Sequence, residues 1–100
     1  MIYLTDRARQ FVEYAVTKFG DADQRGIWND WARAHPVVVV TKSALPRVVA
    51  QAALDALIAY GRSMDQRIEA GADDDDTISD LENDLSFVEA ISRDMRMELR

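Results

Sequence analysis

Residues 43–71 read SALPRVVAQAALDALIAYGRSMDQRIEAG, and this stretch decides the fold. An α-helix turns 100° per residue, so most apolar residues of the stretch fall on one broad arc opposite a narrow polar stripe. A surface helix carries an apolar stripe of about 100°, and this arc is roughly twice as wide. We therefore predict one long helix over residues 44–70, placed at the centre of a helical bundle.

Both ends of this predicted helix carry residues that are typical of helix termini. Ser43 is a plausible N-cap, Pro46 is tolerated in a first turn, and Gly71 is a natural terminator. Ile58 lies within the polar stripe. The apolar arc comprises Leu45, Val48, Val49, Ala52, Ala53, Ala56, Leu57, Ala59, Tyr60, Met64 and Ile68.

Two shorter helices precede the central one. Thr5 is placed to cap a helix over residues 6–19, and Asp21 or Asp23 a second over residues 22–34. The second helix ends before Pro36, because the residue before a proline avoids the α region. It carries two tryptophans three positions apart, Trp28 and Trp31. We expect both to anchor the helix to the core, with a partner-facing aromatic patch as the alternative.

A fourth helix is predicted over residues 77–98, where Thr77 and Asp80 resemble a capping box. Because only a short loop separates it from residues 44–70, the two long helices should form an antiparallel hairpin. Its apolar stripe alternates three and four residues apart, as heptad core positions do. The stripe comprises Ile78, Leu81, Leu85, Val88, Ile91, Ser92, Met95 and Leu99.

The remaining apolar stretches are short. Residues 1–4 read as an extended segment, and the four valines at 37–40 favour a short strand because they are β-branched. A strand paired with residues 1–4, a buried linker and a helical turn remain open for 37–40. The predicted fold is all-α: a single four-helix, bundle-like domain over residues 1–100, with this minor strand.

Composition excludes several classes of function. The chain has no cysteine and one histidine, so a structural zinc site, a thiol nucleophile and a disulfide scaffold are all excluded. The four glycines are scattered and form no phosphate-binding loop. No apolar run reaches the length of about 20 residues that a membrane span needs. We therefore predict a cytoplasmic protein that is not an enzyme, needs no cofactor or metal, and binds no membrane.

Charge is concentrated in the last quarter of the chain. The net charge is −6, and residues 73–100 contain ten acidic and three basic side chains. This distribution argues against direct binding to nucleic acid, which needs a basic surface. Four consecutive aspartates, 73–76, exceed what complementing one helix dipole requires. We interpret the excess either as a solubilising face or as a docking surface for a basic partner.

Phe87 lies at the edge of this acidic region and is predicted to provide an apolar anchor; contact with one of the first two helices is the alternative. The candidate partner-binding residues are Asp73, Asp74, Asp75, Asp76, Asp80, Glu82, Asp84, Phe87 and Glu89.

The function we predict is non-catalytic protein binding. A small acidic domain of this kind fits an inhibitor of the immunity, antitoxin or phage counter-defence type. It would block a basic surface of its partner, such as a nucleic-acid-binding protein or a nuclease, by imitating nucleic-acid phosphates. The main alternative is a homo-oligomeric structural or adaptor bundle joined through Ile58, the tryptophans or the wide face of the central helix. A carboxylate enzyme using Asp30 and Asp55 is a third interpretation.

Overall fold

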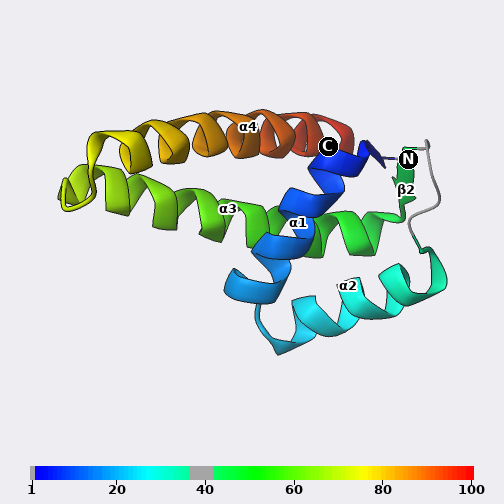
Figure 1. Cartoon of the computed structure of the whole chain (residues 1–100). Coiled ribbons are helices and arrows are strands. Elements are labelled where there is room, and N and C mark those ends of the chain that lie inside the picture. Colours follow the sequence, from blue (N-terminus) through cyan, green and yellow to red (C-terminus); the bar gives the residue numbers. More distant parts are fainter. Residues whose placement is uncertain (1, 37–41) are drawn as a thin grey trace.

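The computed structural model describes residues 2–36 and 42–100. These residues form four helices and two short strands, which confirms the predicted all-α, bundle-like fold (Figure 1). The central helix α3 contacts α1, α2 and α4. In chain order the elements are β1 (Ile2–Leu4), α1 (Asp6–Phe19), α2 (Ala22–Ala34), β2 (Ser43–Leu45), α3 (Arg47–Ala70) and α4 (Asp75–Leu99).

Local capping sets the bounds of α1 and α2, which match the predicted ranges. The Thr5 side chain accepts a hydrogen bond from the Ala8 N–H at 3.1 Å. Asp21 accepts one from the Gln24 N–H at 2.7 Å, and the Gln24 side chain accepts one from the Asp21 N–H at 3.0 Å. These caps satisfy N–H groups that the first turn of a helix otherwise leaves without a partner.

The predicted start of the central helix is wrong by three residues, and so is its predicted cap. Ser43 does not cap α3 but belongs to β2, and Pro46 occupies the N-cap position with φ −61° and ψ 155°. Leu45 precedes this proline, which keeps it out of the α region. Its side chain is fully buried, so the extended conformation also places Leu45 in the core.

Strand β2 pairs with β1 in a two-stranded sheet. Ile2 lies opposite Leu45, and Leu4 lies opposite Ser43 in an antiparallel register. The extended conformation predicted for residues 1–4 is confirmed at Ile2–Leu4. The segment predicted as a strand, residues 37–40, lies outside the described residues.

Helix α4 begins two residues earlier than predicted. Its N-cap is Asp74, whose side chain accepts a hydrogen bond from the Thr77 N–H at 2.8 Å. Thr77 is therefore inside the first turn, and the predicted capping box with Asp80 does not form. The Asp74 side chain accepts from the Thr77 N–H and adds a negative charge at the helix N-terminus.

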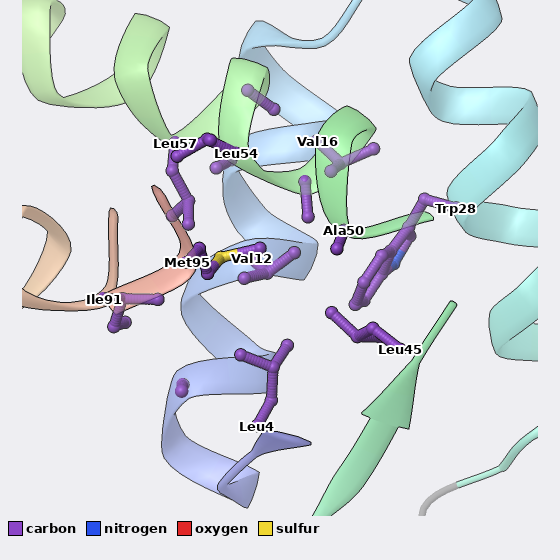
Figure 2. Close-up of a cluster of buried hydrophobic side chains, with 14 of the residues drawn as sticks. Leu4, Val12, Val16, Trp28, Leu45, Ala50, Leu54, Leu57, Ile91 and Met95 are labelled. Atoms are coloured by element: carbon purple, nitrogen blue, oxygen red, sulfur yellow. The ribbon is translucent and has the colours of Figure 1, made fainter. Parts of the chain in front are cut away.

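Side chains from every element meet in one core. Figure 2 shows Val12, Leu57 and Met95, which come from three different helices, gathered at its centre. Trp28 is fully buried and Trp31 nearly so, which confirms their predicted role as core anchors. Val48 was predicted to lie on the apolar arc, but it is 62% exposed, whereas Val49 and Ala50 in the same turn of α3 are buried.

Among the described residues Arg9 is the one charged residue in the core, and it joins α1 to the end of α2 and to β2. Its guanidinium donates to the Ser43 Oγ at 3.0 Å and to the His35 carbonyl at 2.7 Å. It also lies 4.8 Å from the centre of the Trp31 ring. Arg9 is only 5% exposed, so these contacts replace part of the hydration that the guanidinium loses on burial, while its Nε–H has no partner among the described residues.

The outer half of the α3–α4 hairpin projects beyond α1 and α2 (Figure 1). The fully buried residues of α4 begin only at Val88. Ile78, Leu81 and Leu85 are half-buried, because in this half the two long helices cover mainly each other. Gly71 ends α3 in the left-handed conformation, with φ 64°. None of the described helices is long and apolar enough to cross a membrane.

Candidate functional site

The acidic run forms the tip of the hairpin, and two of its four members have structural contacts. Asp73 accepts a hydrogen bond from Arg67 at 3.0 Å. Asp74 caps α4, and hydrogen bonding by the Thr77 side chain and then by its N–H lowers the pKa of the Asp74 carboxyl. Among the described residues, no group of three His, Cys, Asp or Glu side chains is placed to hold a metal ion.

The other two aspartates of the run, Asp75 and Asp76, lie in the first turn of α4 and are exposed. Within the described part of the chain they make no hydrogen bond or ion pair through their side chains, and the same is true of the exposed Asp80. These three carboxylates are therefore the free charges of the tip. We call Asp75, Asp76 and Asp80 the tip carboxylates.

The remaining predicted acids do not share one face of α4. Five positions separate Asp84 from Glu89, which turns the second about 140° from the first. Asp84 lies on the side of α1, where its charge acts on Tyr60. Glu89 lines a groove between α3 and α4, and the exposed Glu82 lies on that flank of α4. The single acidic face that the sequence suggested is thus divided by the apolar seam of the helix.

Tyr60 sits among aromatic rings on the α1 side of the hairpin. Its ring stacks on Phe19 with centroids 5.2 Å apart and lies 5.1 Å from the ring of Tyr14. Burial raises the pKa of the Tyr60 hydroxyl, and the nearby charges of Asp84 and Tyr14 raise it further. The three rings fill the space between them, so this cluster joins α1 to α3.

Phe87 lies apart from the tip, at the middle of α4. Twelve residues of helix separate it from Asp75, a rise of about 18 Å. Its ring is half-buried against Phe11, with centroids 4.8 Å apart, and the Arg7 guanidinium lies 4.6 Å from the ring centre. The alternative interpretation of Phe87, contact with the first helix, is confirmed.

Phe87 also lines a groove between β1 and the C-terminal half of α4. The groove has a volume of about 520 Å³. One wall is residues 2–5, and the other is formed by residues of α4 between 87 and 98. Tyr3 and Met97 lie along it and are 61% and 63% exposed. Large apolar side chains that are exposed next to a groove are typical of a binding surface.

The charged residues that line the β1–α4 groove within the described part of the chain are both acidic. Asp94 and Glu98 are the charged residues among those that line it. The C-terminal end of α4 adds the negative end of its helix dipole nearby, although Arg47 donates a hydrogen bond to the carbonyl of Leu99. Apolar walls and a negative rim suit a ligand that carries both apolar and basic groups.

Sequence analysis named Phe87 but missed the other residues of this groove. Tyr3, Asp94, Met97 and Glu98 were not candidates, because residues 2–5 and 87–98 meet only through the tertiary fold. One signal was present in the sequence: Met97 lies off the core stripe of α4.

A second groove of about 510 Å³ runs between α3 and α4 on the flank of Glu89. Its floor includes Ile58 and Leu85, and its rim carries charges of both signs. The charged residues are Arg62, Asp65, Glu89, Arg93 and Arg96. Ile58, predicted within the polar stripe, is half-buried here against the core.

Neither of the carboxylates considered for an enzyme is in a groove. Asp30 lies 4.0 Å from Arg33, with both side chains 80% exposed. Asp55 is exposed and accepts a hydrogen bond from Gln51 at 3.0 Å. Comparison of the chain with protein-family models, with curated proteins and with solved structures finds no match.

Proposed function

We propose that this chain is a non-catalytic binding module for a basic protein and acts as an inhibitor of the immunity, antitoxin or phage counter-defence type. The observation that carries the proposal is the β1–α4 groove, which combines apolar walls with Asp94 and Glu98 as its lining charges. Interfaces of this construction have an apolar centre for affinity and a charged rim for selectivity.

The tip carboxylates give the proposed module a second role in binding. They lie in the first two turns of α4, which begins at the projecting end of the hairpin (Figure 1), and their side chains make no hydrogen bond or ion pair within the described part of the chain. Charges of this kind raise the association rate by attracting an oppositely charged partner over a distance. The tip therefore steers the basic partner, and the groove holds it.

The partner class follows from this charge. A protein that binds nucleic acid presents a basic surface to phosphates. Carboxylates spread along α4, from the tip to Glu98, occupy such a surface in place of phosphates. Nucleic-acid-binding proteins and nucleases are therefore the first partners to test, and the mechanism is steric and electrostatic blocking of their basic surface.

The test begins by capturing partners from the source lysate with tagged protein, washed at low and then high salt. Association with the captured protein is then measured for wild type and for the triple variant Asp75→Asn, Asp76→Asn, Asp80→Asn. We expect association at low salt to slow by about tenfold and its salt dependence to flatten, with dissociation little changed. The variant leaves the structural contacts of Asp73 and Asp74 in place.

The matched control removes three acidic charges elsewhere, with Glu13→Gln, Asp23→Asn and Asp30→Asn. All three side chains are exposed and lie on α1 or α2. This control has the same net charge as the tip variant, so a slower rate for both would show only an effect of net charge. Equal rates for wild type and the tip variant would refute the steering role of the tip.

The second groove favours one other function, self-association as a structural or adaptor bundle. In a two-fold dimer the same patch meets itself, so a rim that carries Asp65 and Glu89 together with arginines is self-complementary. None of these charged residues forms an ion pair within the described part of the chain. They are therefore available to a second copy, and pairing two hairpins would make a four-helix bundle.

Light scattering during size exclusion tests this alternative over a range of protein concentration. A dimer that is lost in Glu89→Arg and restored by mixing that variant with Arg93→Glu would support it. A monomer at every concentration, in low and in high salt, would exclude self-association and leave the binding module for a basic protein as the proposed function.

A further inference from the structure

Among residues 2–36 and 42–100, strand β1 has a strand partner on one edge only. The sheet contains β1 and β2, and within the described part of the chain no backbone hydrogen bond joins Ile2–Leu4 to any other element. All three residues of β1 line the β1–α4 groove, whereas no residue of β2 does. The unpaired edge of β1 is therefore a wall of the groove. Such an edge presents N–H and C=O groups that can pair with a further strand.

The opposite wall of the groove is apolar. Phe87, Ile91 and Met95 line it from α4, and the exposed Met97 lies at its end. Successive side chains of a strand point to opposite faces. A strand that lies along β1 would turn alternate side chains toward this wall, so those side chains need to be apolar.

The charges of the groove specify the other side chains of such a strand. Asp94 and Glu98 are one helical turn apart on α4, and both are exposed. Arg7, which stands over Phe87, does not line the groove. A segment bound here therefore meets two carboxylates and no cation among the lining residues, which selects Lys or Arg.

We propose that the groove binds an extended segment of a basic partner protein, which adds a third strand to the free edge of β1. Its apolar side chains pack on α4, and its Lys or Arg side chains pair with Asp94 and Glu98. This inference rests on the proposed function, because it specifies how the basic partner binds. The three residues of β1 span about 10 Å, so backbone pairing is short and the two side-chain contacts supply much of the affinity.

The test uses a library of random dodecapeptides displayed on phage, selected on the whole protein. We expect the enriched peptides to alternate apolar residues with Lys or Arg. In a synthetic enriched peptide, methylation of alternate backbone nitrogens removes the N–H donors that face β1. Alternate nitrogens form two sets, of which one faces β1. Methylation of that set should weaken binding by about tenfold or more, while methylation of the other set should have a smaller effect.

Variants of the protein locate the bound peptide. Asp94→Asn with Glu98→Gln should weaken binding by about tenfold, and Tyr3→Ser with Met97→Ser should weaken it as well. Val48→Ser is the matched control, because Val48 is equally exposed and does not line the groove. In amide NMR spectra of the complex, exchange with solvent should slow in β1.

The outcomes separate this inference from the proposed function. Strand addition would be overturned if methylation of either set of nitrogens had the same effect on binding, or if the peptides mapped to the tip or to the α3–α4 groove. Either result would leave the proposed function, a binding module for a basic protein, in place. A library that yields no basic peptide would also overturn strand addition. The proposed function fails independently, if the captured protein binds with the same rate and affinity when the tip carboxylates, Asp94 and Glu98 are all neutralised.

Discussion

The same substitution, glycine to alanine, should have opposite effects at two positions of this fold. Gly71 ends α3 with φ 64° and ψ 20°, in the left-handed region. Gly26 lies inside α2 and is exposed. A Cβ built at either position meets no atom within 4 Å. Packing therefore contributes almost nothing at either site, and the backbone conformation alone determines the sign of the change.

The magnitudes follow from that conformation. An L-residue in the left-handed region costs about 1–2 kcal/mol, so Gly71→Ala should lower the free energy of unfolding by at least about 1 kcal/mol. Alanine is better than glycine in a helix interior by about 1 kcal/mol, so Gly26→Ala should raise it. The two variants then differ by about 2 kcal/mol, which is roughly a thirtyfold difference in the folding equilibrium.

Urea unfolding followed by fluorescence measures this difference, since Trp28 and Trp31 are buried and change environment on unfolding. The slope m should stay constant, which shows that only stability has changed. Gly71→Asn is the control, because asparagine tolerates the left-handed cap better than alanine. The conformational argument would be contradicted if both alanine variants changed the free energy of unfolding in the same direction, or if Gly71→Asn were as unstable as Gly71→Ala.

Three further predictions concern the core, a tyrosine and a helix cap. Trp28→Ala should lower the free energy of unfolding, measured with a chemical denaturant, by about 3–5 kcal/mol. Trp28→Phe should lower it much less, because the indole N–H has no hydrogen-bond partner within the described residues. Ultraviolet titration should find that Tyr60 ionises above the usual range of tyrosine, and Asp84→Asn should lower the pKa of Tyr60 by removing the negative charge beside it. The stability that depends on neutral Tyr60 is fully present below the usual pKa of tyrosine, and it is lost as the pH rises through the raised pKa of Tyr60 in the folded protein. Because its pKa is lowered, Asp74 stabilises α4 above its ordinary carboxyl range, and this contribution is lost as pH falls through the lowered pKa. Asp74→Asn should therefore lose less stability than wild type between pH 6 and pH 3 in thermal unfolding.

The parts of the fold that local signals determine were predictable from the sequence. Thr5 and Asp21 cap α1 and α2 through contacts three residues away, so the bounds of these helices were correct. At α4 only Thr77 was predicted as the cap, and this was wrong, because the Asp74 side chain accepts a hydrogen bond from the Thr77 N–H and so places Thr77 inside the helix. Ser43 was misassigned because its partner in the sheet, Leu4, is remote in the sequence.

The candidate site was harder to predict for the same reason. The acidic tip is contiguous in sequence and was identified there, including Asp75 and Asp76. The β1–α4 groove joins residues from opposite ends of the chain, and neither end alone has a pattern that indicates binding. Phe87 was noticed only because it lies beside the core stripe of α4, and its contact with Phe11 needed the tertiary structure.

The contacts of Arg9 have a consequence for how the elements are held together. Arg9 donates hydrogen bonds to the carbonyl of His35, at the end of α2, and to the hydroxyl of Ser43, in β2. One side chain of α1 therefore fixes two segments that are remote from it in the sequence. A substitution of Arg9 should loosen both segments at once, whereas a substitution of Ser43 should affect only the contact with β2.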